Sequence, residues 1–240
     1  MRLFGLRTSA PNNPPSRRPP RPGLPGSTQC KSSPVWPARN GAGSLTGPRL
    51  WVVRHGETAW SACGRHTSRS DLPLTELGED EALALKPLLS EQQFPLVLSS
   101  PMQRAARTAE LAGFTAVTDN DLVEWDYGEL EGLTTEQIRD RYPGWTIWEG
   151  PWPGGESPVQ VAARADRALQ RARAVGGDVL MFAHGHILRV LTARWLRRPP
   201  TDGRILILRT GAVGVLGWEH GSPAVDLWNV SPRLLRLAEA

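Results

Sequence analysis

Short apolar runs alternate with stretches of helical hydrophobic spacing from residue 49 onward. A short apolar run that ends at a polar turn is typical of a buried strand. The pattern predicts five strands, at residues 50–53, 96–98, 178–183, 213–218 and 225–230. Apolar residues at helical spacing predict helices at residues 75–90 and 185–196, and we expect Pro87 to break or kink the first of them.

Three segments have the sequence of a helix start. In the first, Ser100 is the expected N-cap, Pro101 takes the first helical position and Gln103 follows three residues after the cap. The same capping-box spacing recurs at residues 134–137 and 157–160. We expect a helix to begin in each of these segments.

Strands that alternate with helices favour an α/β fold. The predicted strands are nearly continuous apolar runs, which is typical of parallel strands buried on both faces. We therefore expect residues 49–240 to form one domain. Its architecture would be a three-layer α/β sandwich, with a mostly parallel central sheet and helices on both faces.

Residues 1–48 differ in composition from the rest of the chain. They hold ten of the 22 prolines, seven basic residues and no Asp or Glu. Because proline lacks an N–H and fixes φ, we expect a disordered Pro/Arg-rich tail with local polyproline II. Three interpretations stay open: a solvated extension or misplaced translation start, a transit peptide, or a ligand for a proline-reading or acidic partner.

The net charge of +4 belongs to this tail. Residues 49–240 carry 21 basic and 24 acidic groups, so their net charge of −3 gives no reason to expect a nucleic-acid partner. Nucleic-acid association through the basic tail is an alternative. No run approaches the ~18 apolar residues of a membrane span, and we expect a cytoplasmic protein without membrane contact. Cys30 and Cys63 are too few for a disulfide framework or a cysteine zinc cluster.

Polar side chains follow three of the predicted strands, and ligands of such sheets bind beyond the carboxyl ends of the strands. Arg54 and His55 follow the first strand, Arg104 lies after the second and His184 follows the third. Glu124 comes after a short apolar pair. We expect these side chains to converge at one edge of the sheet.

This set of groups suits the transfer of a phosphoryl group. Guanidinium groups offer planar forked donors to phosphate oxygens, a neutral imidazole can attack phosphorus, and a carboxylic acid can protonate a departing alkoxide. The chain has no Gly-rich P-loop, so nucleoside triphosphate chemistry of that kind is not indicated. The arginines supply the positive charge that magnesium supplies elsewhere, and we expect neither a metal nor a cofactor.

The motifs along residues 49–240 resemble the histidine phosphatase superfamily, which has the phosphoglycerate mutase-like fold. They are Arg54-His55-Gly56-Glu57-Thr58, Gly64-Arg65, Leu72-Pro73-Leu74-Thr75, Ser99-Ser100-Pro101 with Arg104 and Thr108-Ala109, Glu124, and His184-Gly185. They occur in the family's order, which makes the resemblance specific. It covers nearly all of the domain and leaves the tail unexplained.

The resemblance implies a role for each matching residue. His55 would be the nucleophile that forms a phosphohistidine, and Arg54, Arg104 and His184 would hold the transferred phosphoryl group. Glu124 would be the acid for the leaving group and then the base that activates water. We expect the other ring nitrogen of His55 to donate to a backbone carbonyl, and the two arginines to lower the pKa of His55.

Further polar positions follow from the same resemblance. Ser61 and Thr67 fall where the family places phosphate contacts, although Ser61 replaces a common asparagine and Ser68 a common glycine. Asp126 is the second choice for the proton donor. Arg65 is either an ion-pair partner or a ligand contact.

The segment that begins at Glu124 separates two activities of the superfamily. Mutases carry Glu-Arg-His-Tyr-Gly there, whereas this chain has Glu124-Trp125-Asp126-Tyr127-Gly128. Without the Arg-His pair, a carboxylate-bearing, doubly anionic substrate is disfavoured. The segment is more similar to broad acid phosphatases and sugar-phosphate phosphatases, above all actinobacterial acid phosphatases once named phosphoglycerate mutases.

The prediction is therefore a phosphomonoester hydrolase, an acid phosphatase that acts on small phosphorylated metabolites such as sugar phosphates. Phosphoglycerate mutase is the alternative, followed by a non-catalytic phosphate-binding protein. The oligomeric state is open, a homodimer included.

Two more features have a structural and a functional interpretation. Trp145, Trp148 and Trp152 lie in a segment rich in Pro and Gly, and would form either a pocket wall or a packed cluster. His186 is expected to lie in the first turn of a helix and to have a structural role there.

Overall fold

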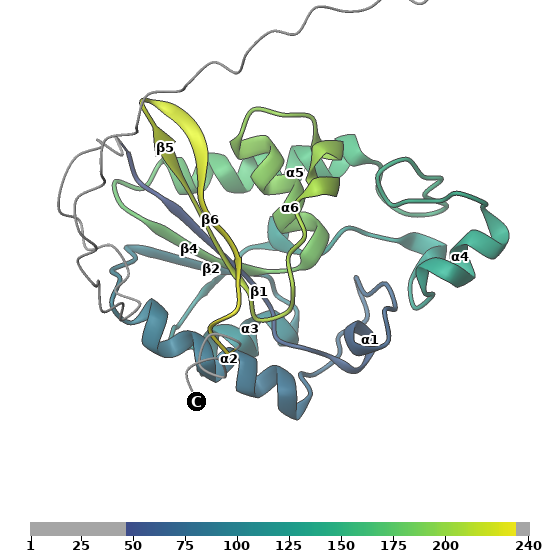
Figure 1. Cartoon of the computed structure of the whole chain (residues 1–240), viewed down its shortest axis with the longest axis horizontal. Coiled ribbons are helices and arrows are strands. Elements are labelled where there is room, and N and C mark those ends of the chain that lie inside the picture. The colour runs from purple at the N-terminus through teal and green to yellow at the C-terminus, as the bar shows by residue number, and fades with distance from the viewer. Residues whose placement is uncertain (1–46, 234–240) are drawn as a thin grey trace, which may run out of the picture. The chain divides into compact units, whose positions relative to one another are not determined.

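The computed structural model describes residues 47–233, which contain one six-stranded sheet (Figure 1). The strands are β1 (Leu50–Arg54), β2 (Leu96–Ser99), β3 (Val117–Thr118), β4 (Val179–Ala183), β5 (Val213–Glu219) and β6 (Ser222–Val230). Their order across the sheet is β3-β2-β4-β1-β5-β6. The five expected strands are present, and β3 is an addition whose two exposed residues form no apolar run.

The strands that the candidate residues follow are paired in parallel. Strand β4 pairs in parallel with β1 and with β2, and β2 pairs in parallel with β3. Strand β5 is antiparallel to β1, and β6 is antiparallel to β5. All of β4 is buried, as a central strand covered on both faces should be. The carboxyl ends of β1, β2 and β4 therefore meet at one edge.

Helices cover both faces of the sheet (Figure 1). Helices α2 (Glu76–Leu89) and α3 (Gln103–Leu111) lie on one face, and α5 (Pro158–Arg173) and α6 (Gly185–Trp195) on the other. The connections contain α1 (Ala59–Ala62), α4 (Thr135–Arg141) and the 3-10 helices η1 (Asn120–Leu122), η2 (Gly128–Leu130) and η3 (Pro200–Ile205). The expected three-layer α/β sandwich with a mostly parallel sheet is confirmed.

Helix α2 is not broken at Pro87, so of the expected break or kink the break is wrong. The helix continues to Leu89, so Pro87 lies in its last turn. Proline removes the N–H that would bond to the carbonyl of Leu83, and the helix continues for two more residues without that hydrogen bond. At the other end Thr75 is the N-cap, and its hydroxyl accepts a hydrogen bond from the N–H of Gly78 at 3.1 Å.

The capping boxes at residues 134–137 and 157–160 are confirmed, whereas Ser100 as an N-cap is wrong. Helix α3 begins only at Gln103, with Met102 in the N-cap position and no side-chain cap. The hydroxyl of Ser100 accepts from the N–H of Met102 at 3.3 Å and also lies 2.8 Å from Nε2 of His184. The hydroxyl is therefore shared between the segment before α3 and a buried imidazole.

The loop after β1 touches the start of α2 backbone to backbone. A Cβ on Gly56 would lie 2.1 Å from the carbonyl oxygen of Gly78, and a Cβ on Gly78 would lie 2.1 Å from the carbonyl oxygen of Glu57. No side chain fits at such distances, so glycine is needed at both positions. This contact fixes the loop that carries His55 against α2.

The predicted boundary between tail and domain lies at the edge of the described range. Strand β1 begins at Leu50. Apart from residues 47 and 48, the segment expected to be disordered lies outside the described residues, and its disorder stays a prediction. Within residues 47–233, none of the helices is long and apolar enough to cross a membrane.

Candidate active site

Residues from the carboxyl edge of the sheet gather around one cavity of about 170 Å³. The lining includes Arg54 and His55 from the end of β1, and Glu124 from the loop after η1. Two further candidates, Arg104 and His184, are fully buried and directly contact one another next to His55. The structure therefore brings together the five residues singled out as catalytic.

His55 is buried, and its hydrogen bonding fixes its tautomer. Its Nδ1 lies 2.7 Å from the carbonyl oxygen of Gly56, which can only accept, so Nδ1 carries the proton and Nε2 keeps a lone pair. Burial, and then the positive charges of Arg54 and Arg104, hold the pKa of His55 well below its ordinary value of 6.5. The expected effect of the arginines is present, although burial is the larger cause.

Arg104 and His184 form a buried pair beside the nucleophile candidate. Nε of Arg104 donates to Nδ1 of His184 at 3.1 Å, so the proton of that neutral ring lies on Nε2, which donates to Ser100. The rings of His184 and His55 meet edge-on with their centroids 5.1 Å apart. Burial, and then the charge of Arg104, hold the pKa of His184 well below its ordinary value.

Arg54 and Arg104 differ in how many of their N–H donors form hydrogen bonds within the protein. The terminal nitrogens of Arg104 donate to the carbonyls of Ser68 and Ser70, both at 2.9 Å. Arg54 donates to the carbonyl of Leu208 at 2.7 Å, but its Nε is buried without a hydrogen-bond partner among the described residues. Burial lowers the pKa of both groups, yet a guanidinium stays charged. Arg54 therefore has a donor that is unpaired within residues 47–233, in a guanidinium that lines the cavity.

The carboxylate of Glu124 lies at the N-terminus of α6. Its Oε1 accepts from the backbone N–H groups of Trp125 and Ile187, both at 2.8 Å, and its Oε2 accepts from the N–H of His186 at 2.9 Å. These donors fix the orientation of the carboxylate. Oε2 accepts only one of them, so it is the oxygen with room for a proton.

Three other candidate side chains have local partners. Ser61 and Thr67 line the cavity, but the hydroxyl of Ser61 caps α1 and the hydroxyl of Thr67 donates to the carbonyl of Arg65 at 3.2 Å. The carboxylate of Asp126 binds Nε of Arg69 at 2.8 Å and does not line the cavity. This geometry favours Glu124 over Asp126 as the proton donor.

The cavity also has a wall of uncharged aromatic groups, most of which the sequence did not single out. The hydroxyl of Tyr127 lies 2.6 Å from Nδ1 of His186, and the rings of Tyr127 and His66 are 4.7 Å apart. Burial lowers the pKa of His66 to about 4 and holds that of His186 well below its ordinary value. Burial also raises the pKa of Tyr127 well above 10. All three groups are neutral at neutral pH.

Arg189 and Arg65 bring positive charge to this wall. Arg189 donates to the carbonyls of Gly203 at 3.0 Å and Arg204 at 2.9 Å, and its guanidinium lies 4.8 Å from the ring centroid of Trp148. Neither Arg189 nor Arg65 forms an ion pair with any residue in the described part of the chain. Of the two interpretations of Arg65, the position in the cavity lining favours a ligand contact.

The three tryptophans pack behind the wall and do not line the cavity. Trp145 and Trp148 belong to the buried core, and Trp152 packs against it. The ring centroid of Trp145 lies 5.3 Å from that of His66, and the ring centroid of Trp148 lies 5.5 Å from that of His186. The tryptophans therefore support the wall from behind, which corresponds to the packed-cluster interpretation.

The arrangement can bind a phosphoryl group and transfer it. Arg54 and Arg104 supply positive charge, His55 supplies a lone pair, and Glu124 can give or take a proton in the same cavity. Within residues 47–233, no three His, Cys, Asp or Glu side chains are grouped so as to hold a metal ion. Fold and cavity thus define an α/β protein with a candidate phosphoryl-binding site at the carboxyl edge of its sheet.

The sequence matches the model of the histidine phosphatase superfamily (branch 1) over residues 50–231. The chain therefore belongs to the histidine phosphatase superfamily, as the motifs indicated.

Characterised relatives specify the kind of enzyme. The acid phosphatase of Mycobacterium tuberculosis is 43% identical over 178 residues, 72% of this chain and 88% of the relative. The sedoheptulose 1,7-bisphosphatase of Saccharomyces cerevisiae is 34% identical over 186 residues, 63% of this chain and 68% of the relative. The solved structure of mycobacterial glucosyl-3-phosphoglycerate phosphatase with VO3 has a TM-score of 0.70 at 30% identity, and the match covers 77% of this chain and 100% of that one. The chain is a histidine-type phosphomonoesterase.

Proposed function

We propose that this enzyme hydrolyses small phosphorylated metabolites, sugar phosphates among them, through a phosphohistidine at His55. The observation that carries the proposal is the tautomer of His55, whose Nδ1–H is bound to the Gly56 carbonyl. The free lone pair on Nε2 lies in a cavity that also contains Arg54 and Glu124. A nucleophile, a cation for the phosphate oxygens and a proton donor are the groups that this reaction needs.

In the first step, Nε2 of His55 attacks phosphorus and forms a P–N bond while the P–O bond to the alcohol breaks. Arg54 and Arg104 balance the negative charge on the phosphoryl oxygens, and His184 holds Arg104 in place through its Nδ1. Glu124 gives the proton on its Oε2 to the departing oxygen, and the alcohol leaves.

In the second step, the ionised Glu124 takes a proton from water, and the oxygen of that water attacks phosphorus. The P–N bond breaks, its electron pair returns to Nε2 of His55, and inorganic phosphate leaves. Glu124 must be protonated in the first step and ionised in the second. We therefore expect a bell-shaped pH dependence of kcat, with an acidic optimum for alcohols that are poor leaving groups.

The two arginines Arg65 and Arg189 in the cavity lining support a polar substrate with more than one anionic group. The missing Arg-His pair after Glu124 disfavours such a substrate, but Arg65 and Arg189 bring two other cations to the cavity. The substrate named for the yeast relative is a bisphosphate. Phosphorylated sugars that carry a second phosphate or a carboxylate are therefore included in the proposed substrate class.

Phosphoglycerate mutase activity is the second candidate, supported by the same two cations. A mutase returns the phosphoryl group to another hydroxyl of the substrate, whereas a hydrolase gives it to water. The two functions therefore differ in whether inorganic phosphate accumulates.

The test is phosphate release from sugar phosphates, sugar bisphosphates, phosphoglycerates and p-nitrophenyl phosphate, with a chelator present. The wild type and His55→Ala are compared. We expect release by the wild type and none above background by the variant. Isomerisation of phosphoglycerates without phosphate release would identify a mutase, and equal release by both proteins would overturn the role of His55.

A further inference from the structure

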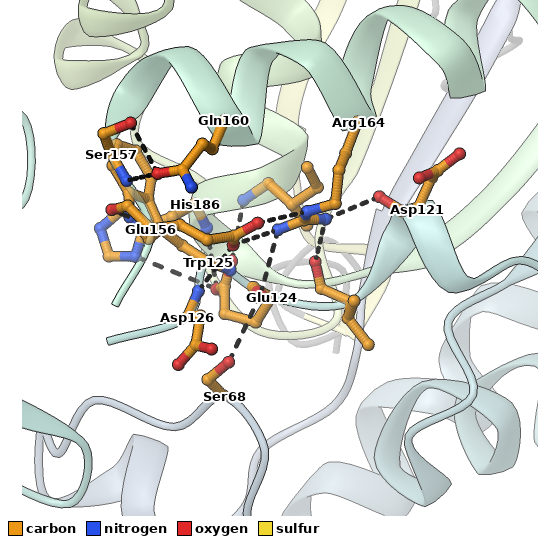
Figure 2. A network of polar contacts seen from close by, with 12 residues as sticks. Ser68, Asp121, Glu124, Trp125, Asp126, Glu156, Ser157, Gln160, Arg164 and His186 are labelled. Atoms are coloured by element: carbon orange, nitrogen blue, oxygen red, sulfur yellow. Dashed lines mark hydrogen bonds and ion pairs between the residues drawn. The ribbon is translucent and has the colours of Figure 1, made fainter. Parts of the chain in front are cut away.

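The loop that carries Glu124 is held by an ion pair outside the cavity. This pair consists of Arg164 on α5 and Glu156, which precedes α5, with hydrogen bonds of 2.8 Å from Nε to Oε1 and 2.7 Å from NH2 to Oε2 (Figure 2). The side chains are 13% and 20% exposed, so solvent screens the pair only in part. Neither residue lines the cavity.

The guanidinium of Arg164 binds the backbone on the N-terminal side of the acid. Its NH1 donates to the carbonyls of Asp121 at 2.8 Å and Val123 at 3.0 Å, and its NH2 donates to the carbonyl of Glu124 at 3.4 Å. These residues end η1 and enter an irregular loop, where no helix or strand supplies backbone partners. The forked donors of one arginine therefore replace regular secondary structure along this stretch.

Glu156 binds the same loop on the C-terminal side of the acid. Its Oε2 accepts from the backbone N–H of Asp126 at 3.0 Å, and its own backbone N–H donates to the carbonyl of Asp126 at 2.9 Å. The indole N–H of Trp125 donates to the carbonyl of Glu156 at 2.7 Å. Figure 2 shows these contacts converging on residues 124–126 from the side of α5.

The carboxylate itself is held by a different element, the N-terminus of α6. The backbone of Glu124 is thus held by α5 and by the hydroxyl of Ser68, which donates to the same carbonyl at 3.4 Å, and the side chain is held by α6. A proton donor must stand within hydrogen-bond reach of the leaving oxygen, and a shift of about 1 Å can cost ~10²-fold in rate.

We propose that Arg164, paired with Glu156, is a positioning residue that keeps Glu124 at the place where it protonates the leaving group. This inference rests on the proposed function, because it assigns Arg164 a part in the acid–base step of that reaction. Loss of the Arg164 contacts lets the loop move, so protonation of the leaving group becomes less efficient while the groups that bind and attack the phosphoryl group keep their places. The pair acts on leaving-group protonation rather than on phosphate binding.

The test uses Arg164→Lys, which keeps one positive charge but loses the fork that binds Glu156 and three carbonyls together. We expect kcat/KM for an alkyl phosphate to fall about tenfold or more, up to the ~10²–10⁴-fold that general acid catalysis contributes as a whole. The first-turnover burst of p-nitrophenolate from p-nitrophenyl phosphate needs little acid assistance, and should stay within about twofold of wild type. In Arg164→Lys, the limb of the pH profile of kcat/KM that depends on the proton donor should also differ from that of the wild type.

Arg167→Ala is the matched control. Arg167 lies on the same helix and forms an ion pair with the side chain of Asp121, but it is exposed and binds none of the loop carbonyls. It should leave both reactions within about twofold of wild type, as expected for an exposed pair. Glu156→Gln, which keeps the shape of Glu156 and removes its charge, should reproduce the leaving-group dependence of Arg164→Lys.

A double-mutant cycle with Glu124→Gln separates positioning from a merely structural role. If Arg164 acts through Glu124, then adding Arg164→Lys to the Glu124→Gln variant should lower kcat/KM for the alkyl phosphate little further. Equal losses for both leaving groups, or additive losses in the cycle, would overturn the proposal. A wild type that releases no phosphate would instead overturn the proposed function, and the two failures are thereby distinguishable.

Discussion

The two sides of the cavity are built in different ways. His55 and Arg54 come from the end of β1, and His184 follows β4, so the phosphoryl side rests on adjacent parallel strands. The leaving-group side consists of Glu124 and the wall with Arg189. These residues come from an irregular loop and a helix, and they are tied together by hydrogen bonds between segments distant in sequence.

The difference separates a rigid part of the site from an adjustable one. Residues at strand ends move only if the central sheet moves, so the geometry for attack on phosphorus is fixed by the fold. The position of the loop with Glu124 depends on hydrogen bonds from side chains, and the shape of the wall depends on packed histidines. We expect substitutions on the phosphoryl side to abolish all reactions, and substitutions on the other side to change which substrates react.

The largest expected effect belongs to His55→Ala. Because this variant removes the nucleophile, kcat should fall by ~10⁴-fold or more with every substrate, activated or not. The measurement is single-turnover kinetics with alkaline quenching, since phosphohistidine is labile in acid. We expect a phosphoenzyme in the wild type and none in the variant, whose fold is checked by circular dichroism. A phosphoenzyme in His55→Ala would move the nucleophile to another histidine.

The next effect is that of Glu124→Gln, which should depend on the leaving group. An alkyl phosphate needs a proton on its departing oxygen, so its kcat/KM should fall about 10²–10³-fold, whereas the first turnover of p-nitrophenyl phosphate should change little. Asp126→Asn is the comparison, because Asp126 has an arginine partner outside the cavity. Equal losses for both substrates would assign the acid role to another group.

A smaller and more selective effect is expected for Arg189→Ala. Two substrates that differ in one carboxylate, 3-phosphoglycerate and glycerol 3-phosphate, report on the second anionic group. The variant should raise KM about tenfold for the first, which corresponds to ~1.4 kcal/mol, and leave the second within about twofold. Arg194→Ala is a control on the same helix, because Arg194 forms its ion pair with Asp166 and does not line the cavity. Equal changes for both substrates would argue against a second anion site.

The smallest effect concerns the pH dependence of stability. Burial keeps the pKa of His66 at about 4 in the folded protein, whereas an unfolded histidine titrates near 6.5. Below pH ~6.5 the unfolded chain therefore binds the additional proton, and the free energy of unfolding falls by up to ~1.4 kcal/mol per pH unit for this residue. This stability is present above pH ~6.5 and is lost as the pH falls toward 4.

The measurement is urea unfolding between pH 7 and pH 5. His66→Gln should give a shallower slope than the wild type, whatever its stability at pH 7. His220→Gln is the control at a histidine whose side chain is 86% exposed. A slope unaltered by His66→Gln would mean that His66 titrates in the folded protein as it does in the unfolded chain.

Sequence patterns could predict the phosphoryl side because its signals are local. Apolar runs mark the strands, and the residues that follow them are brought to one edge by parallel pairing. The same reasoning misassigned Ser100, since its hydroxyl is shared between a local helix start and His184, which is distant in sequence. Strand β3 was missed because two exposed residues have no pattern of their own.

The leaving-group side gave only weak signals. His186 and Arg189 are three residues apart on α6 and therefore share a face, which could have linked Arg189 to the cavity. Nothing in the sequence pairs His66 with Tyr127, because the loops that carry them meet only in the folded chain. The contacts of Arg164 with backbone carbonyls have no sequence signal, since a carbonyl is the same in every residue.

The backbone contact between Gly56 and Gly78 has a consequence for changing this enzyme by mutation. A library that varies the residues around His55 loses every member that carries a side chain at position 56, because the added Cβ would meet a backbone atom at 2.1 Å. Position 78 is closed for the same reason, although it lies in helix α2 outside the cavity lining. New specificities are therefore accessible through the wall with His66 and Arg189, and not through position 56 in the loop of the nucleophile.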